Sequence, residues 1–471
     1  MKNSRREFVK LSLGGIGAGV LSSALGGSRA AGSSRQGAKN VLFIIVEDLK
    51  NIMGCYGNPL VLTPNLDRLA QKGVVFDHAY CQFPVCNPSR TSFLTGLRPD
   101  TTKILDNGVP WSTHVKNQVT LPKLFKENGY YTVGMGKIFH GEKDHDDVQA
   151  WDERMDFGQT ETGKQGEGRN MTGGRIEWCR WLAAQGTDDD QPDGRLAARA
   201  VQFLNQPHDK PFFMALGFHK PHDPFEAPKK YFDMYPLDKL MPPVVPDNHA
   251  PKEEFILGSS WASVFKEFSL QDQREFTRAY YAAVSFTDAQ IGRVMDAMDR
   301  QNLWKDTVVI FIGDHGYNLG EHHWWNKAVL FEDATRIPMI AVVEGETPPH
   351  RRCDQFVELV DLYPTFADLC GLKAPANLEG LSFRPLLSEP DKPWKIAAYT
   401  QVQRGGTAGK SVRTRRWRYN EWIRDGKVIW TELFDHASDP QEYRNLSGMS
   451  DFKETCQELS SLLKSGHNRL Q

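Results

Sequence analysis

The sequence has almost no net charge, few cysteines and one apolar segment outside its predicted strands, and each shortage excludes a class of protein. Its 57 Lys and Arg residues against 59 Asp and Glu residues leave a formal net charge of −2, which favours neither nucleic acid nor a membrane surface as a partner. Seven cysteines in 471 residues are too few for a disulfide scaffold, and an odd number leaves at least one unpaired. The apolar segment, residues 11–27, is short and glycine-rich, so we expect no stable membrane span.

The overall amino-acid composition is that of an ordinary globular protein. Hydrophobic residues make up 40% and charged residues 25% of the chain, which is enough apolar side chain for a large core. A chain of 471 residues can form one large domain with an appendage, or two to three domains.

The first 31 residues resemble a twin-arginine export signal. Arg5 and Arg6 are followed by Phe8 and by the weakly apolar segment, and cleavage is plausible near Ala30 or Ala31. The alternative, a membrane anchor, is disfavoured by the same glycine content. We therefore expect the twin-arginine export machinery to carry the folded chain to the periplasm or out of the cell, where some cysteine pairing is possible.

Apolar runs alternate with amphipathic segments along most of the chain, which predicts a doubly wound α/β fold. Residues 40–46 and 307–312 are continuously apolar, as expected for strands buried on both faces of a parallel sheet. Further strands are predicted at 74–76, 131–135 and 211–216, and helices at 66–72, 121–128 and 275–302.

The character of the sequence changes near residue 389. Segments 396–402, 411–414, 417–422 and 432–435 alternate like antiparallel strands, and 452–464 reads as a helix. We therefore predict a catalytic domain over 38–388 and a small α+β subdomain with an antiparallel sheet over 389–471. Residues 141–193 and 236–260 are predicted to be irregular surface loops.

The most informative residue is Cys86, in the run Pro84-Val-Cys-Asn-Pro-Ser-Arg90. Pro88 suits the first turn of a helix, so Cys86 lies at or just before a helix N-terminus, where free N–H groups favour a tetrahedral anion. Arg90, one turn on, can offer paired donors to the same anion. A tyrosine-phosphatase loop requires Cys-x5-Arg and is a poor fit, whereas a buried structural cysteine is the plain alternative.

Polar side chains follow four of the predicted strands, where ligand sites of α/β sheets lie. The hard oxygen donors Glu47, Asp48 and Asp314, with His315 beside them, suit Ca²⁺ or Mg²⁺. A second set can carry or accept protons and suits an oxyanion and its leaving group: Arg90, Lys137, His140, His222 and Lys327. Zinc is disfavoured because His322 and His323 lack a His-x3-His spacing.

These motifs resemble the type I sulfatases of the alkaline phosphatase superfamily, and among them the iduronate-2-sulfatase-like branch. The likeness extends over nearly all of the chain beyond the export signal. It rests on Cys-x-Pro-Ser-Arg and on these further words: Val46-Glu-Asp-Leu49, Thr63-Pro-Asn-Leu-Asp67, Phe93-Leu-Thr-Gly96, Arg98-Pro-Asp-Thr-Thr102, His219-Lys-Pro-His222, Asp314-His-Gly316 and Ser411-Val-Arg-Thr414.

The resemblance implies an alkaline phosphatase-like fold with a large, mixed, mostly parallel sheet flanked by helices. It implies that a maturase oxidises Cys86 to formylglycine, and that calcium, rather than magnesium, is held by Glu47, Asp48, Asp314, His315 and the modified Cys86. One departure concerns Glu47, since family members commonly have two Asp residues where this chain has Glu47-Asp48. Because Glu is one methylene longer than Asp, we expect the ion to shift or Glu47 to bind it differently.

The implied reaction is hydrolysis of a sulfate ester. One hydroxyl of the hydrated aldehyde at position 86, activated near calcium and by Asp314, attacks sulfur, while calcium, Arg90, Lys137 and Lys327 stabilise the developing charge. His222 or Lys327 protonates the leaving alcohol. His140 then takes a proton from the remaining hydroxyl, and sulfate leaves.

The implied substrate is a sulfated carbohydrate, such as a uronate 2-O-sulfate. Specificity is expected in loops 101–115 and 141–190, at His219, and in the C-terminal subdomain, where Arg413 and Arg418 could meet carboxylates unless they lie on a solvated strand face. Two alternatives remain open. One is a phosphonate monoester or phosphodiester hydrolase of the same superfamily, and the other is a non-catalytic glycan-binding protein with an unmodified Cys86.

Overall fold

The computed structural model describes residues 39–141, 145–246, 249, 251, 253–258, 261–467 and 470. The predicted export signal, residues 1–31, lies outside this part of the chain. Within the described residues, no helix combines the length and apolar character that crossing a bilayer requires.

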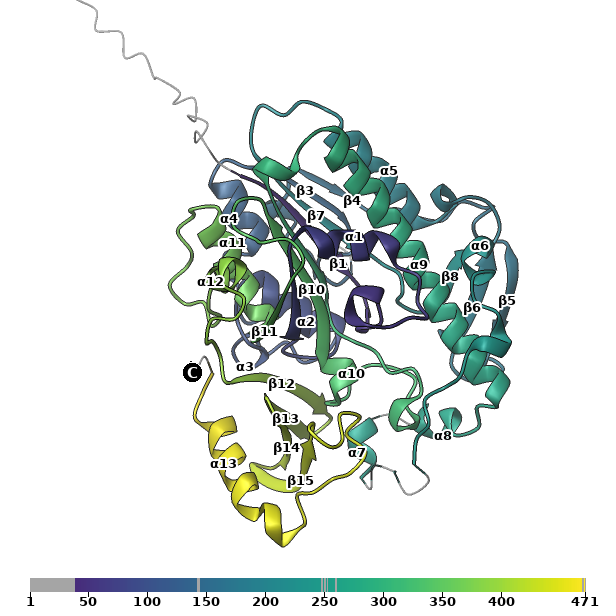
Figure 1. The fold of residues 1–471 in the computed structure, drawn as a ribbon, viewed down its shortest axis with the longest axis vertical. Coiled ribbons are helices and arrows are strands. Elements are labelled where there is room, and N and C mark those ends of the chain that lie inside the picture. Colours follow the sequence, from purple (N-terminus) through teal and green to yellow (C-terminus); the bar gives the residue numbers. More distant parts are fainter. Residues whose placement is uncertain are drawn as a thin grey trace, which may run out of the picture.

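An eight-stranded sheet runs through the centre of the molecule in the order β11-β2-β10-β9-β1-β7-β3-β4 (Figure 1). Strand β10 is antiparallel to its neighbours β9 and β2, and the other neighbouring pairs are parallel. The predicted mixed, mostly parallel sheet is therefore confirmed. The strands are β1 (Asn40–Val46), β2 (Val74–Tyr80), β3 (Tyr131–Gly136), β4 (Glu153–Met155), β7 (Phe212–Phe218), β9 (Thr307–Gly313), β10 (Arg336–Val343) and β11 (Arg351–Glu358).

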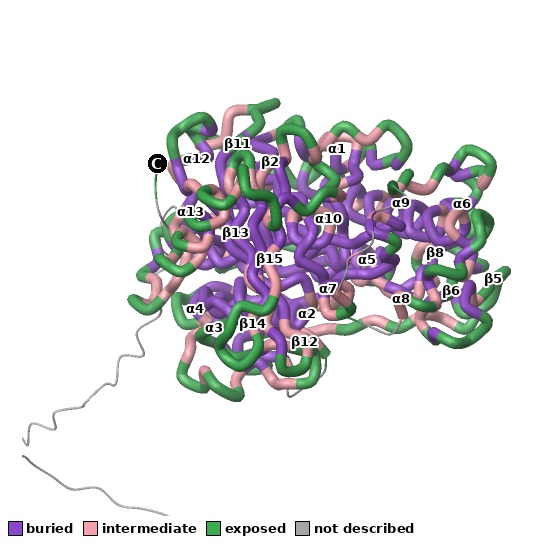
Figure 2. Tube along the Cα trace, turned by 90° about the horizontal axis from the view of Figure 1, so that it is seen from below, coloured by how far each residue is buried: buried purple, intermediate pink, exposed green. Residues whose placement is uncertain are grey.

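Strand β1 shows how the sheet divides the core, because successive side chains point to opposite faces. Leu42 and Ile44 face one core with residues of α1 (Pro64–Lys72), α5 (Pro192–Leu204) and α9 (Leu270–Arg300). Phe43 and Ile45 face a second core. That core includes residues of α2 (Cys86–Thr95), α4 (Leu121–Glu127), α11 (Leu362–Leu369) and α12 (Arg384–Ser388). Figure 2 shows the resulting buried centre, with exposed chain confined to the rim.

The long helix α9 begins earlier than predicted. Ser269 and Asp272 form a capping box, in which the Asp272 N–H donates to Ser269 Oγ at 3.2 Å and the Ser269 N–H donates to Asp272 Oδ2 at 2.9 Å. The first turn, Leu-Gln-Asp-Gln-Arg, is mostly polar and carries little helical periodicity, so only its cap marks the start.

The prediction of loops over 141–193 is wrong in part. Strand β4 joins the central sheet, and a small second sheet has the order β5-β6-β8, built from β5 (Gly166–Asn170), β6 (Arg180–Ala184) and β8 (Phe225–Pro228). Strand β5 has the sequence Gly-Glu-Gly-Arg-Asn and is largely exposed. It has no apolar alternation and two glycines, so nothing in its pattern indicates a strand.

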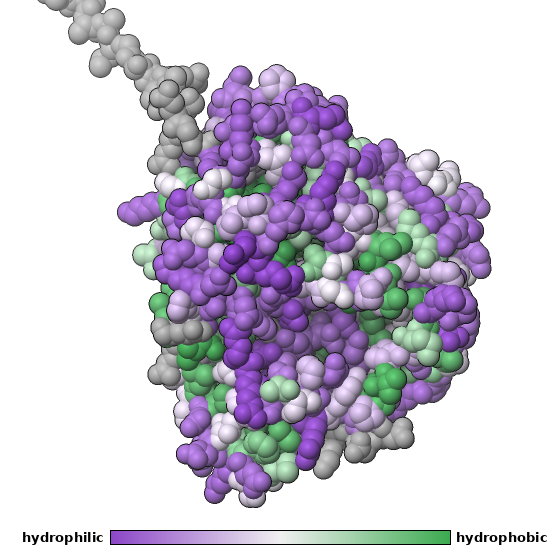
Figure 3. All heavy atoms as spheres, viewed as in Figure 1, coloured by the Kyte–Doolittle hydropathy of each residue, from purple (hydrophilic) through white to green (hydrophobic). Residues whose placement is uncertain are grey.

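The remaining helices are short, and several border the C-terminal sheet or the loop that precedes α9. They are α3 (Pro99–Thr102), α6 (Lys229–Phe232), α7 (Glu254–Leu257), α8 (Trp261–Phe265) and α10 (Glu332–Thr335). Hydrophilic side chains predominate on the face shown in Figure 3.

A separate antiparallel sheet forms the C-terminal part, as predicted. Its four strands, β12 (Ala397–Arg404), β13 (Thr407–Thr414), β14 (Trp417–Arg424) and β15 (Lys427–Asp435), pair in sequence order, and α13 (Lys453–Lys464) packs on them. The predicted domain boundary falls between α12 and β12.

Buried ion pairs join this sheet to the catalytic domain. Arg418 of β14 is fully buried, and its guanidinium donates to Glu332 of α10 at 2.5 Å and to Glu442. Arg413 is also buried and pairs with Glu332 at 3.2 Å. The expectation that Arg413 and Arg418 meet substrate carboxylates is therefore corrected: the carboxylates they meet belong to the chain itself.

Arg418→Ala should lower the free energy of unfolding by about 3–5 kcal/mol, because it leaves two buried carboxylates with one partner fewer. Arg415→Ala is the matched control. Arg415 pairs with Asp354 on the surface, and its loss should cost at most about 1 kcal/mol. Denaturant unfolding of the two variants checks this. A stable Arg418→Ala protein with a raised KM would instead restore a role in substrate binding.

Candidate active site

Helix α2 places Cys86 at its first position. Val85 is extended (φ −147°, ψ 140°) and ends the preceding loop, and Pro88 occupies the first turn, where a missing N–H costs little. The helix is buried along its whole length and stops at Gly96, whose φ of 70° suits glycine. The positive end of the helix dipole therefore lies beside Cys86, although the Asn87 N–H donates to Asn107 Oδ1 at 3.1 Å and the Ser89 N–H to the Val85 carbonyl at 3.1 Å.

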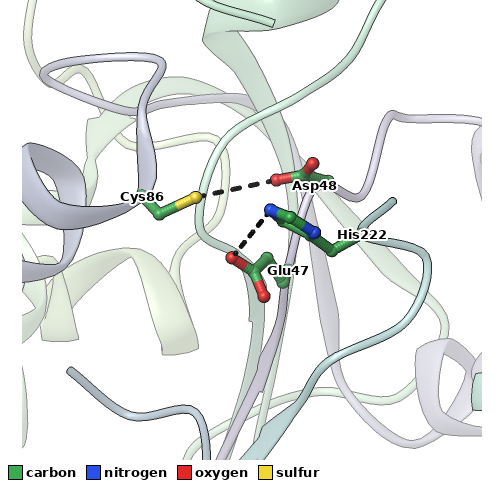
Figure 4. Close-up of side chains that lie close together, drawn as sticks. All are labelled: Glu47, Asp48, Cys86 and His222. Carbon is green, nitrogen blue, oxygen red and sulfur yellow. Dashed lines mark hydrogen bonds and ion pairs between the residues drawn. The ribbon is translucent and has the colours of Figure 1, made fainter. Parts of the chain in front are cut away.

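The parallel strands bring the other predicted residues to the same edge. Glu47 and Asp48 follow β1, Asp314 and His315 follow β9, His219 and His222 follow β7, and Lys137 follows β3. Since β9, β1, β7 and β3 are parallel neighbours in the sheet, their carboxyl ends meet. Figure 4 shows Cys86, the adjacent Glu47 and Asp48, and His222 lying close together, from three segments of the chain.

Asp48 lies in a turn that hydrogen bonds hold in an unusual conformation. Its φ is 58°, in the left-handed region that non-glycine residues seldom occupy. The Asp48 N–H donates to Asp314 Oδ1 at 3.0 Å, the Tyr280 hydroxyl donates to the Asp48 carbonyl, and the Lys50 N–H donates to Tyr280 at 2.9 Å. Helix α9 thereby fixes the turn that aims the Glu47 and Asp48 carboxylates.

The Cys86 sulfur has three charged or polar neighbours. Lys327 Nζ is 3.1 Å, His315 Nε2 3.4 Å and Asp48 Oδ1 3.9 Å from Sγ. Burial raises the pKa of the Cys86 thiol well above its usual value, although Lys327 and Lys137 oppose this. The unmodified thiol is thus kept protonated, and a thiolate nucleophile is disfavoured.

The carboxylates and their neighbours form two groups that share Cys86 and suit a hard cation. Within each group one ligand atom per residue lies within 4.8 Å of all the others: Glu47, Asp48, Cys86 and His222 in one, and Cys86, Asp314 and His315 in the other. Glu47 Oε2 is buried and accepts no hydrogen bond from the residues that the structure describes, although the His219 ring is 3.3 Å away. Buried carboxylate oxygens of this kind fit Ca²⁺ or Mg²⁺. The longer Glu47 side chain still reaches the group.

Cations compensate these buried carboxylates. Burial alone raises the pKa of Glu47, but its basic neighbours His222, Lys137 and His219 outweigh it and hold the pKa well below its usual value. At neutral pH both imidazoles are neutral, so Lys137 is the cation that pairs with the Glu47 carboxylate. For Asp48 the balance is reversed: burial raises the pKa despite Lys327, whose Nζ lies 2.6 and 2.8 Å from the two carboxylate oxygens.

Arg90 is anchored and still has a donor to spare. Its Nε donates to Asp314 Oδ2 at 2.8 Å, and its Nη1 donates to the carbonyls of Lys137 and Ile138, the latter at 3.0 Å. Its Nη2 is buried and has no hydrogen-bond partner among the described residues. An unused charged donor beside Cys86 fits an oxyanion that the free protein lacks.

His140 and His219 line a pocket of about 430 Å³ next to Lys137. Burial, with the nearby Lys137, lowers the pKa of His140 to about 3, which keeps this ring neutral at neutral pH. The structure brings His140 to the rim of the site, and no contact joins it to Cys86 among the residues described.

Two supporting residues are not evident from the sequence. Tyr280 lies in α9, far along the chain from the Asp48 turn that it holds, and its position in the helical pattern predicts only a core residue. The Asp193 carboxylate accepts the backbone N–H groups of His219 and Lys220 at 2.9 and 2.8 Å and so fixes the loop after β7. Asp193 follows Pro192 at the start of α5, where an acidic residue is ordinary.

Comparison with known proteins decides the family. The family described as Sulfatase matches residues 39–372, and the one described as N-sulphoglucosamine sulphohydrolase, C-terminal, matches residues 320–469. The chain belongs to the sulfatase family. It is thus a sulfuric ester hydrolase, of a family that uses formylglycine and a metal ion.

Two curated relatives agree along most of the sulfatase chain. Iduronate 2-sulfatase of Mus musculus is 33% identical over 486 residues, which cover 84% of this chain and 87% of that protein. A sulfatase of Formosa agariphila is 33% identical over 453 residues, covering 90% and 86%. The predicted iduronate-2-sulfatase-like resemblance is confirmed.

Solved structures confirm the fold alone, since their sequence identities are low. A 2-O GAG sulfatase superposes with a TM-score of 0.73 at 22% identity, covering 91% of each chain. Phosphonate monoester hydrolase of Agrobacterium radiobacter superposes with a TM-score of 0.75 at 20% identity, covering 91% of this chain and 95% of the other. The fold therefore does not distinguish sulfate from phosphonate esters.

Asp314→Asn should lower both the bound metal and kcat, the latter by roughly 10²-fold or more, with a smaller change in KM. The reason is that charge stabilisation at this site acts mainly in the transition state. Elemental analysis and steady-state kinetics measure the two effects. Glu47→Asp is the control and should keep the metal. Full activity of metal-free protein after exhaustive chelation would contradict the assignment.

Proposed function

We propose that this sulfatase uses a formylglycine at position 86 and a calcium ion to remove sulfate from a sulfated carbohydrate, such as a uronate 2-O-sulfate. The observation that carries the proposal is the surroundings of Cys86, which combine a helix N-terminus, Lys327, His315 and the unused Arg90 donor. Formylglycine would supply a hydrated aldehyde as nucleophile. Calcium, held by Glu47, Asp48, Asp314, His315 and position 86, would supply Lewis acidity. Calcium is favoured over magnesium because it accepts crowded, irregular oxygen ligation.

The chain's own cations would bind the sulfate group. The unused Nη2 of Arg90, the positive end of the α2 dipole and the ammonium group of Lys327 beside Cys86 support this, and Lys137 pairs with the neighbouring Glu47. The Asp314 carboxylate is oriented by Arg90 and lies next to the nucleophile position, where it can take a proton.

Lys327 is better placed than His222 to protonate the leaving alcohol. His222 Nδ1 contacts the Asp223 carbonyl, which can only accept a hydrogen bond, so the proton of the neutral ring lies on Nδ1. Nε2 then has no proton to give. Lys327, in contrast, lies 3.1 Å from Cys86 Sγ as an ammonium group, because the neighbouring Asp48 outweighs burial and raises its pKa. His140, held neutral, is the proposed base for regeneration.

A carbohydrate substrate is supported by the relatives at 33% identity, among which iduronate 2-sulfatase is named for a uronate sulfate. His219 supports it also, since its side chain is 43% exposed at the pocket beside Lys137 and can meet a substrate there. A phosphonate monoester hydrolase is the second candidate, on the strength of the superposition.

The test of this function is a desulfation screen over sulfated oligosaccharides of known linkage, run beside phosphonate and phosphate esters of matched leaving group. We expect sulfate release from at least one uronate 2-O-sulfate and kcat/KM for sulfate esters at least about tenfold above the phosphorus esters. Faster turnover of phosphonate esters would replace the proposal with the second candidate. Cys86→Ala is the inactive control.

Cys86 should mature to formylglycine when the protein is made together with the maturase. Mass spectrometry of the peptide that holds Cys86 should then show an aldehyde in place of the thiol. Cys86→Ala should abolish turnover and leave the unfolding transition in place. A fully active protein that keeps the thiol would exclude the formylglycine mechanism. Its activity would also exclude the alternative of a non-catalytic glycan-binding protein.

We also propose that the twin-arginine machinery exports the enzyme to the periplasm or beyond. The support is the Arg5-Arg6 pair ahead of a weakly apolar segment. Substituting both arginines with lysine should retain the uncleaved protein in the cytoplasm. Wild-type protein with an intact N-terminus after export would argue against cleavage near Ala30 or Ala31.

A further inference from the structure

A groove of about 870 Å³ lies where the C-terminal sheet meets the catalytic domain. One wall is the tip of the β12–β13 hairpin and the end of β14, and the other comprises α7, α8 and the turn at Glu321–His323. Phe255 of α7 packs on Trp422 of β14 with ring centroids 5.2 Å apart. Aromatic packing between the catalytic domain and the C-terminal sheet therefore forms the floor of the groove.

Arg404 lines this groove, and its charge is not compensated. Its Nε and Nη2 are buried and have no hydrogen-bond partner, while Nη1 donates to the Gln403 carbonyl at 3.2 Å. Among the described residues no carboxylate pairs with it. The side chain packs against the backbone of Gly258, where an added Cβ would lie 1.6 Å from Nε. Burial lowers the pKa of Arg404 to about 10.

The arginines that are buried as whole residues behave differently. Arg90, Arg98, Arg413 and Arg418 each meet a carboxylate within 3.2 Å in the structure. Arg404 is only partly buried, but two of its guanidinium nitrogens are shielded from water without a partner among the described residues, which is costly, so we look for an anionic partner that the free chain does not provide.

The groove favours an oxyanion. Arg424 and Lys266 also line it, against the acids Glu253 and Glu254, and none of these groups forms an ion pair among the described residues. The Arg404 guanidinium keeps two parallel donors, Nε and Nη2, that no described protein group uses. Both are shielded from water beside Gly258, so the side chain must turn into the groove before they meet the paired oxygens of a sulfate or a carboxylate.

The groove is close to the reaction centre along the chain. His323 lines it and Lys327 contacts Cys86, and four residues can separate their Cα atoms by at most about 14 Å. A separation of this size is within the length of a short oligosaccharide.

We propose that Arg404, with Arg424 and Lys266, forms a subsite for a second acidic group of the carbohydrate chain whose sulfate ester is hydrolysed at position 86. The inference rests on the proposed function and adds that the preferred substrate is an oligosaccharide carrying more than one anionic group. The group bound at this subsite is a sulfate or carboxylate oxyanion, about one to three sugars from the scissile ester.

Binding to Cys86→Ala protein in calcium buffer tests the subsite. We expect Arg404→Gln to weaken binding of a multiply sulfated uronate tetrasaccharide at least tenfold, as loss of a charge-assisted pair predicts, and to leave a monosulfated monosaccharide unaffected. Tetrasaccharides lacking either the remote sulfates or the carboxylates identify which anion is bound. The control is Arg415→Gln, which removes an exposed arginine of the same sheet and should change neither affinity.

A second readout separates binding from structure. Arg404→Gln should raise the Tm of the ligand-free protein, because it removes an uncompensated buried charge, and should reduce the rise in Tm that the tetrasaccharide causes. A lower Tm with unchanged affinity for the tetrasaccharide would show that Arg404 is structural and overturn the subsite. Failure of the wild-type enzyme to release sulfate from any carbohydrate would instead overturn the proposed function.

Discussion

Buried charge that must be matched at one edge of the sheet is the constraint on which this structure depends. Glu47, Asp48 and Asp314 are all fully buried, and like charges so placed would repel and raise one another's pKa. Lys137, Lys327 and Arg90 reach them from three other segments. The register of β9, β1, β7 and β3 is therefore an electrostatic requirement as well as a packing arrangement.

Some buried charges of the molecule are fully paired by the chain, and others are not. Around Arg418 the ion pairs are complete, and the result is a joint between the catalytic domain and the C-terminal sheet. At Arg90 Nη2 and at Arg404 they are incomplete, and donors are left buried without partners. Because an unused buried donor costs stability, the incomplete cases mark places where a ligand, and not the chain, completes the hydrogen bonding.

The sequence predicts the parts of the fold whose signal is local. Strand β1 is continuously apolar, and Cys86 follows the Pro-containing pattern of a helix start, so the positions and roles of both can be inferred from the residues next to them. Strand β5 has no such pattern. Arg418 could not be assigned either, because its partner Glu332 lies 86 residues away and only the fold brings them together. Residues that act through long-range pairing, such as Tyr280 on the Asp48 turn, are missed for the same reason.

Charge balance also explains why the site needs a cation for its chemistry. Three carboxylates face three side-chain cations, so the protein residues alone are close to neutral and attract a sulfate ester weakly. A bound divalent ion would leave the site positive by about two charges, which matches an anionic ester and favours its more highly charged transition state. Asp48, whose Oδ1 lies 2.6 Å from Lys327 Nζ, would be one of the residues that hold this ion. The proposed metal site and the proposed proton donor therefore share a single carboxylate.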